Sequence, residues 1–240
     1  MVYRILFNSA YDALEKILLL LAFVATAMFA ISLHEYAHGF AAYKMGDPTA
    51  KVQGRLTLNP IAHFEPIGLI MFLLVGFGFA RPVPINPYNF TNLRKGMLWT
   101  SFAGVIANLI QAIIGFGLMI GFGYLYLTSQ ATGALHYLLF FFFNFSLYAT
   151  LLNAVLIAFN LLPIYPLDGF RVVESLSRTE NAYVRFMRRY GQYILIGIVL
   201  IGFLFERIGF PQGDIFGQYL SVVQKGILNL FYKIMEGVIA

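Results

Sequence analysis

The sequence feature that most constrains this chain is an apolar run, 17–42, that is long enough to cross a lipid bilayer and that contains His34-Glu35-Tyr36-Ala37-His38. A helix places residues four apart on one face, so the two imidazoles can share a metal ion with a carboxylate beside them. A charged side chain at this depth costs about 2.5–3.5 kcal/mol on insertion scales, which makes ionisable residues there candidates for function. The alternative is that the histidines only hydrogen-bond to neighbouring helices, while Glu35 snorkels or is protonated.

The composition predicts an all-α polytopic membrane protein. Hydrophobic residues make up 60% of the chain and charged residues 11%, and the mean hydropathy is +0.75. Four segments are long and apolar enough to be transmembrane helices: 17–42, 99–127, 134–162 and 190–205. Because no repeat or long linker divides the chain, we expect a single domain over 1–240 with its core at about 17–175. The tail, 214–240, is predicted to be an amphipathic helix at the membrane interface or packed against the bundle.

A fifth apolar segment, 66–80, is shorter and contains three glycines, so we interpret it as re-entrant or interfacial rather than as a span. The reason is the number of membrane crossings between the two polar groups of the proposed site. The two histidines lie near the C-terminal end of the first long helix, and a second polar pair, Asp168-Gly169, follows the third. If both groups bind one metal ion, an even number of crossings must separate them, and a spanning segment at 66–80 would make that number odd.

The distribution of basic residues predicts the orientation. The loops 43–98 and 163–189 carry six and five Lys or Arg residues, whereas the turn 128–133 carries none. Basic loops face the cytoplasm, so we expect a multi-pass protein of a prokaryotic cell membrane with the site nearer the cytoplasmic side. The net charge of +5 fits loops that face anionic lipid, and no nucleic acid is expected as a partner.

A catalytic zinc ion normally takes three protein ligands, so the two histidines need a third. The chain has no cysteine, so the third ligand must be a His, Asp or Glu, and four candidates lie near apolar segments: His63, Glu65, His136 and Asp168. Asp168 belongs to the stretch Asn160-Leu-Leu-Pro-Ile-Tyr-Pro-Leu-Asp168-Gly169, in which two prolines break a helix just before the carboxylate.

The two motifs together resemble a known family. A membrane-embedded H-E-x-x-H followed over a hundred residues later by N-x-x-P-x-x-x-L-D-G is similar to the site-2 protease family of intramembrane zinc metalloproteases. The segments 46–50, 54–60, 81–87 and 103–108 resemble the compact prokaryotic members, which lack PDZ and CBS domains, although the family commonly has Pro where Val105 stands. The resemblance covers about residues 30–175.

The resemblance implies a role for each matching residue. His34, His38 and Asp168 would bind one Zn²⁺ per chain, Glu35 would activate the attacking water, and Asn160 would help to hold the substrate. The alternative for Asn160 is an interhelical hydrogen bond. The implied activity is that of a metalloendopeptidase cleaving peptide bonds within or near transmembrane segments of membrane-protein substrates, and it allows for a regulatory membrane partner.

Two other classes of function stay open at this point. One is a metal-binding membrane transporter or scaffold without protease activity, although a transporter would be expected to show inverted repeats with broken helices, and none is visible. The other is a zinc-dependent hydrolase of membrane lipid amides, which could use the same metal site.

Overall fold

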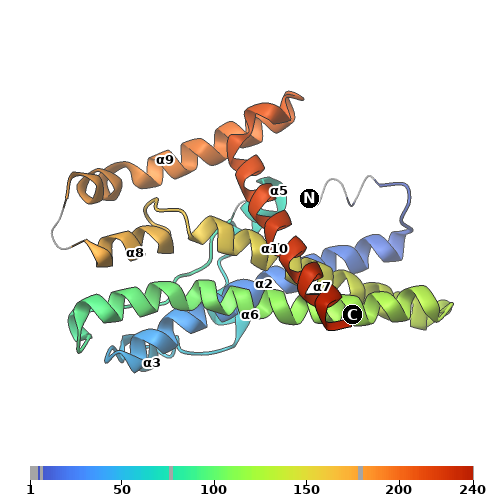
Figure 1. Ribbon diagram of the computed structural model, residues 1–240, viewed down its shortest axis with the longest axis horizontal. Coiled ribbons are helices and arrows are strands. Elements are labelled where there is room, and N and C mark those ends of the chain that lie inside the picture. Colours follow the sequence, from blue (N-terminus) through green and yellow to red (C-terminus); the bar gives the residue numbers. More distant parts are fainter. Residues whose placement is uncertain (1–4, 6–7, 76–77, 178–180, 240) are drawn as a thin grey trace.

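The computed structural model describes residues 5, 8–75, 78–177 and 181–239, and over these residues it is helical, with no strand. Residues 76 and 77 of the predicted segment 66–80, and Arg178 in the basic loop, lie outside the described part. The helices in chain order (Figure 1) are α2 (Ala13–Lys44), α3 (Thr49–Val52), α4 (Pro60–His63), α5 (Pro66–Val75), α6 (Leu93–Thr128), α7 (Gly133–Asn160), α8 (Asp168–Leu176), α9 (Ala182–Arg207) and α10 (Ile215–Ile239), with 3₁₀ turns at Pro87–Asn89 and Pro211–Gly213.

The helices α2, α6 and α7 form the packed centre of the molecule. The helix α6 is antiparallel to both of the others. Thr100 lies beside His38 and Gln111 beside Ala30 on α2, and Gly115 lies beside Thr150 and Gly123 beside Phe143 on α7. Close approach is made possible by small side chains, since Ala22, Ala112 and Ala154 are completely buried. As a result, the C-terminal ends of α2 and α7 lie at the same end of the bundle.

Among the described residues, four helices are long and apolar enough to cross a membrane: α2, α6, α7 and residues Ala182–Phe205 of α9. The prediction of four membrane helices is therefore confirmed. Three of the helices are longer than their apolar segments, most clearly α9, which begins at Ala182 rather than at 190, whereas α7 ends at Asn160, two residues before its predicted segment. The reason is that hydropathy marks the lipid-facing stretch, whereas a helix continues through flanking polar residues until its backbone is capped.

The segment after the first long helix does not supply a further crossing. The helix α5 has ten residues, which corresponds to about 15 Å, half of the roughly 30 Å hydrocarbon core. After it, residues 78–86 have no regular secondary structure and return to α2, where Val83 packs against Gly39. This agrees with the prediction that 66–80 does not span.

The loop that follows α2 is fastened to this returning chain by one buried carboxylate. Asp47 accepts hydrogen bonds from the backbone N–H of Asn86 (2.7 Å), from the Asn89 amide (2.9 Å), and from the backbone N–H (3.1 Å) and hydroxyl of Thr49. The side chain of Asp47 is completely buried. The network therefore holds residues 78–90 beside the C-terminal end of α2.

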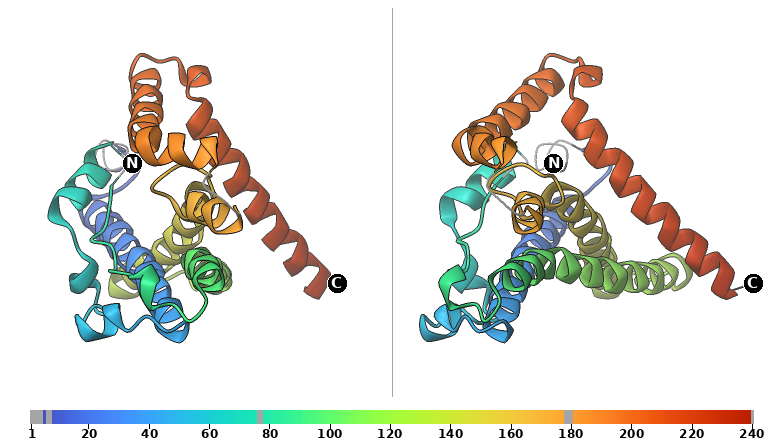
Figure 2. Two further views of the ribbon diagram at one scale, coloured as in Figure 1. Left: turned by 90° about the vertical axis from the view of Figure 1, so that its left-hand side faces the viewer. Right: turned by 60° about the vertical axis from the view of Figure 1, so that its left-hand side comes forward.

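The C-terminal helix packs across the bundle (Figures 1 and 2), in agreement with the predicted amphipathic helix at 214–240. Phe231 is buried against Phe116 of α6, with ring centroids 5.2 Å apart. Tyr219 and Gln224 each donate a hydrogen bond to a backbone carbonyl of α7, at 3.1 Å.

Candidate active site

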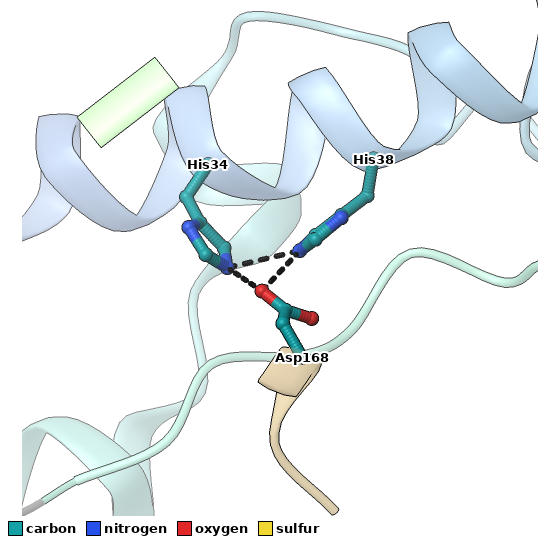
Figure 3. A group of neighbouring side chains, drawn as sticks. All are labelled: His34, His38 and Asp168. Carbon is teal, nitrogen blue, oxygen red and sulfur yellow. Dashed lines mark hydrogen bonds and ion pairs between the residues drawn. The ribbon is translucent and has the colours of Figure 1, made fainter. Parts of the chain in front are cut away.

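The structure brings three predicted metal ligands together at the end of the bundle where α2 and α7 end. His34 and His38 project from successive turns of α2, and Asp168 is the first residue of α8 (Figure 3). Asp168 Oδ2 lies 3.3 Å from His34 Nε2 and 3.2 Å from His38 Nε2, and the two Nε2 atoms are 2.9 Å apart. All three side chains are buried.

The donor atoms fit a single metal ion. The Nδ1 of His38 is 2.7 Å from the carbonyl oxygen of Thr100, so it carries the proton and leaves the Nε2 lone pair facing the cluster. Asp168 Oδ2 is buried without a hydrogen-bond partner among the described residues. Ligand atoms about 2.0–2.1 Å from a tetrahedral zinc ion lie about 3.3 Å apart, close to the spacing found here. Among the residues that the structure describes, only these three form such a group.

The charge state of Asp168 also suits a ligand. Burial raises the pKa of its carboxyl group, but the neighbouring His38 and His34 imidazoles lower it by more, so the net pKa lies well below the usual value. The group is therefore ionised, as coordination requires.

Glu35 lies beside the cluster and is held by the returning chain. Its Oε2 accepts a hydrogen bond of 2.8 Å from the backbone N–H of Val83. No hydrogen bond to the other carboxylate oxygen, Oε1, is found within the described part of the chain, where the one bond to this carboxylate is that of Val83. Val83 thus fixes the carboxylate through one oxygen and leaves the second free to accept a proton.

Two glycines allow the helices around the site to approach one another closely. A Cβ at Gly104 of α6 would lie 2.5 Å from His34 Cε1 and 2.5 Å from His38 Nε2, so both rings rest directly on this backbone. A Cβ at Gly169 would collide with the carbonyl oxygens of Leu161 and Leu162 at the end of α7. Glycine therefore lets α6 support the histidines and lets α8 bring Asp168 close to them.

The other candidate ligands lie elsewhere. The Nε2 of His63 is 2.9 Å from the backbone oxygen of Thr57, in a loop. His136 pairs with Glu15 at 3.3 Å, near the opposite end of α2. Glu65 is not part of the cluster that holds His34, His38 and Asp168.

Asn160 is the last residue of α7, and its amide donates to the carbonyl oxygen of Leu156 in the same helix at 3.1 Å. Its predicted contact with substrate stays a prediction.

An apolar cavity of about 290 Å³ lies between α2, the segment 60–80, α7 and the α9–α10 pair. Ile31 and Ser32, one turn before the metal-binding pair, line it from α2, and Leu156 and Phe159 line it from α7. Its few polar groups include Ser32 and Glu65. The cavity can therefore accept an apolar segment close to the histidines.

Three contributors to the site were not identified from the sequence as functional. Thr100 and Val83 act through backbone atoms, which every residue has, so no side-chain pattern marks them. Gly104 belongs to the segment 103–108 that resembles the family, and a glycine in a long helix is the signal that could have pointed to a close approach.

Comparison with known proteins agrees with this geometry. The chain is 46% identical over 156 residues to the "Putative zinc metalloprotease YwhC" of Bacillus subtilis, which covers 64% of this chain and 68% of that protein. It is 27% identical to the Rip2 protein of Mycolicibacterium smegmatis, over 74% of this chain and 66% of Rip2. It is 30% identical to Rip2 of Mycobacterium tuberculosis H37Rv, over 66% of this chain and 58% of that Rip2 protein. No solved structure matches significantly.

The sequence pattern of "Peptidase family M50" matches residues 22–202, which include every residue of the site. This match covers well over half of the chain, and the protein therefore belongs to peptidase family M50, the site-2 protease family of metalloproteases that its two motifs predict.

Proposed function

We propose that this protein is a zinc-dependent intramembrane endopeptidase that hydrolyses peptide bonds within or near transmembrane segments of other membrane proteins. The observation that carries the proposal is the convergence of His34, His38 and Asp168 in a buried cluster on membrane-spanning α2, with Glu35 beside it. Ionisable side chains are costly in this setting, so a structure that gathers four of them supports a chemical role.

His34 and His38 through Nε2, and Asp168 through Oδ2, would hold one zinc ion per chain. A zinc ion supplies Lewis acidity, which polarises the scissile carbonyl and lowers the pKa of water. Glu35 accepts the proton of the attacking water at Oε1 and delivers it to the nitrogen of the leaving amine, while Val83 N–H keeps Oε2 in place.

The surroundings of the site favour an apolar substrate. The cavity beside α2 is lined mainly by aliphatic and aromatic side chains, as an enzyme for transmembrane segments requires. A helical substrate must unwind before its carbonyl is accessible, and its freed backbone groups then need partners. We assign this role to Asn160, whose amide oxygen can accept a backbone N–H, and to the chain around Val83.

The orientation follows from the loops at this end of the bundle. The loops 43–98 and 163–189 flank the cluster and carry the basic residues that are typical of cytoplasmic loops. We therefore place the active site nearer the cytoplasmic side of a prokaryotic cell membrane, within a single domain spanning 1–240. Access of substrate to the cavity is the step at which a regulatory membrane partner would act.

The test compares the wild type with Glu35→Gln, in which an amide of similar size cannot accept a proton. Purified protein in detergent or vesicles is incubated with transmembrane-segment substrates, selected by proteomics of membrane fragments that appear only in cells with the wild type. We expect cleavage by the wild type to fall at least about 10²-fold in Glu35→Gln, the lower range for loss of a general base, with zinc content unchanged.

The matched control is Glu174→Gln, which removes a partly buried carboxylate that pairs with the exposed Arg188 away from the cluster. Its activity should equal that of the wild type. Substantial cleavage by Glu35→Gln would remove Glu35 as the base. Zinc-dependent release of fatty acid from lipid amides, without cleavage of any membrane protein, would replace the endopeptidase with a lipid-amide hydrolase. Metal transport without hydrolysis would favour a transporter.

A further inference from the structure

Near the metal-binding cluster, the buried polar groups that have no partner among the described residues include one nitrogen of His34 and the side-chain amide of Asn108. The Nδ1 of His34 has no hydrogen-bond partner among the described residues, in contrast to the Nδ1 of His38, which bonds to the Thr100 carbonyl oxygen. Asn108 on α6 is completely buried, and neither its Oδ1 nor its Nδ2 has a partner in the described part of the chain. Leaving a buried amide or imidazole unpaired is energetically costly, so each of these groups requires an explanation.

The register of α2 and α6 places Asn108 one helical turn beyond the point at which His34 meets α6. The helices run antiparallel, with Thr100 beside His38 and Gly104 beside His34. Seven residues after Gly104, the Gln111 amide lies 3.4 Å from the carbonyl oxygen of Ala30. Asn108 lies between these two contacts and one helical turn after Gly104, so it faces the turn of α2 between Ala30 and His34.

The orientation of the His34 ring points its free nitrogen towards Asn108. Its Nε2 faces His38 and Asp168, towards the N-terminal end of α6. The two nitrogens of an imidazole lie on opposite sides of Cε1, and His34 Cε1 rests on Gly104. Its Nδ1 is therefore directed towards the following turn of α6, and Figure 3 shows this nitrogen on the side of the ring away from the other two ligands.

We propose that Asn108 is a positioning residue for the metal site, whose Oδ1 accepts a hydrogen bond from Nδ1–H of His34 when Nε2 binds zinc. This inference rests on the proposed function, because it assumes that His34 is a zinc ligand. A histidine bound through Nε2 carries its proton on Nδ1 and normally donates it to an oxygen, which fixes the tautomer and the ring plane. Thr100 supplies that oxygen for His38, and Asn108 supplies it for His34.

A hydrogen bond to His34 would explain why an asparagine lies at this depth in a membrane helix. An amide in a membrane helix is unfavourable unless it is paired, and Asn108 is completely buried near the middle of α6 rather than near a helix end. One hydrogen bond to His34 would satisfy two of the unpaired atoms at once. The side chain of Asn108 does not touch the metal, so its effect on catalysis passes entirely through His34.

The first experiment measures zinc affinity by competition with a chelator in detergent-solubilised protein. Asn108→Leu keeps the volume but removes the acceptor, and we expect affinity to fall about 10–100-fold, as is typical when the oxygen partner of a metal-binding histidine is removed. Asn108→Asp keeps an acceptor and adds a charge, so it should bind zinc at least as tightly as the wild type.

The matched control is Asn144→Leu. Asn144 is a buried asparagine on α7 whose amide donates to Phe140 in the same helix, far along the chain from any ligand. A merely structural role for buried asparagines would lower zinc affinity equally in Asn108→Leu and Asn144→Leu, which would overturn the proposal. Zinc affinity within threefold of the wild type in Asn108→Leu would also overturn it.

A second measurement does not depend on how well Asn108→Leu folds. The chain has four histidines, so ¹⁵N-labelled ring nitrogens of zinc-loaded wild type and Asn108→Asp can be assigned by single His→Gln substitutions. We expect a protonated, slowly exchanging His34 Nδ1 whose resonance shifts in Asn108→Asp, whereas that of His38 does not. An unshifted His34 resonance refutes the pairing. Absence of zinc from the wild type itself, or zinc retained in His34→Gln, would instead refute the proposed metal site.

Discussion

Adding one methyl group at Gly104, where α6 contacts both metal-binding histidines, should abolish zinc binding and activity. In Gly104→Ala the new Cβ would lie 2.5 Å from His34 Cε1 and from His38 Nε2, about 0.9 Å closer than the 3.4 Å at which ordinary contacts begin. Neither ring can move aside freely. The imidazole of His38 is held by the Thr100 carbonyl oxygen on its other side, and both rings face Asp168.

The size of the effect follows from this displacement. Moving both rings by about 0.9 Å takes two of three ligands out of a position that metal coordination defines to within about 0.2 Å. Misplacement of a catalytic group by about 1 Å costs about 10²-fold in rate, or about 2.7 kcal/mol. We therefore expect kcat/KM to fall at least about 100-fold and zinc to be lost from most of the protein.

Gly117→Ala is the control, because it makes the same change on the same helix where a Cβ would meet nothing within 4 Å. Both variants are purified, checked for monodispersity and thermal unfolding, and assayed for zinc by mass spectrometry and for cleavage of a membrane substrate. Gly117→Ala should match the wild type. Wild-type zinc content and activity in Gly104→Ala would show that the histidines do not rest on α6, and the reasoning would fail.

Three further predictions follow from the described contacts. Asp168→Ala should lose zinc while the protein stays folded, and unchanged zinc by mass spectrometry would remove Asp168 from the site. Burial raises the pKa of Asp47 but the hydrogen bonds that it accepts lower it by more, so its contribution to stability is full above the usual carboxyl pKa of about 4 and is lost as the pH falls through the lower folded-state value. The Tm difference between wild type and Asp47→Ala should accordingly be constant near neutral pH and shrink below about pH 4; a pH-independent difference would contradict the role of the charge. Because the chain has no cysteine, single cysteines at the exposed Lys51, close to Asp47, and at Asn92 should both label from the cytoplasm and one at Ser129 from outside, and external labelling at Lys51 would contradict the topology.

Much of the fold is visible in the sequence because it follows from local rules. Hydropathy over about 20 residues identifies a membrane helix, and four such helices are present. The segment 66–80 can likewise be interpreted from the sequence as not spanning the membrane, because that conclusion needs only the order of the apolar segments and one shared metal site. Helix ends are less accurate, as α9 shows by starting at Ala182, since capping and flanking polar residues decide them.

The sequence by itself determined that this is a helical membrane protein with two histidines and a glutamate on one helix, because i, i+4 spacing and hydrophobicity are properties of a single segment. The sequence also restricted the third metal ligand to four candidates: His63, Glu65, His136 and Asp168. Only the tertiary structure showed Asp168 beside the histidines and His63 and His136 paired elsewhere.

Only the tertiary structure, likewise, showed which groups hold the site in place. Thr100 lies 62 residues from His38, and Val83 lies 48 residues from Glu35, and both act through backbone atoms that leave no trace in the residue type. Gly104 matters through the two histidine rings that pack against it, and that depends on the register of α6 against α2. Such contacts are set when helices distant in sequence pack together, so the local sequence pattern does not contain them.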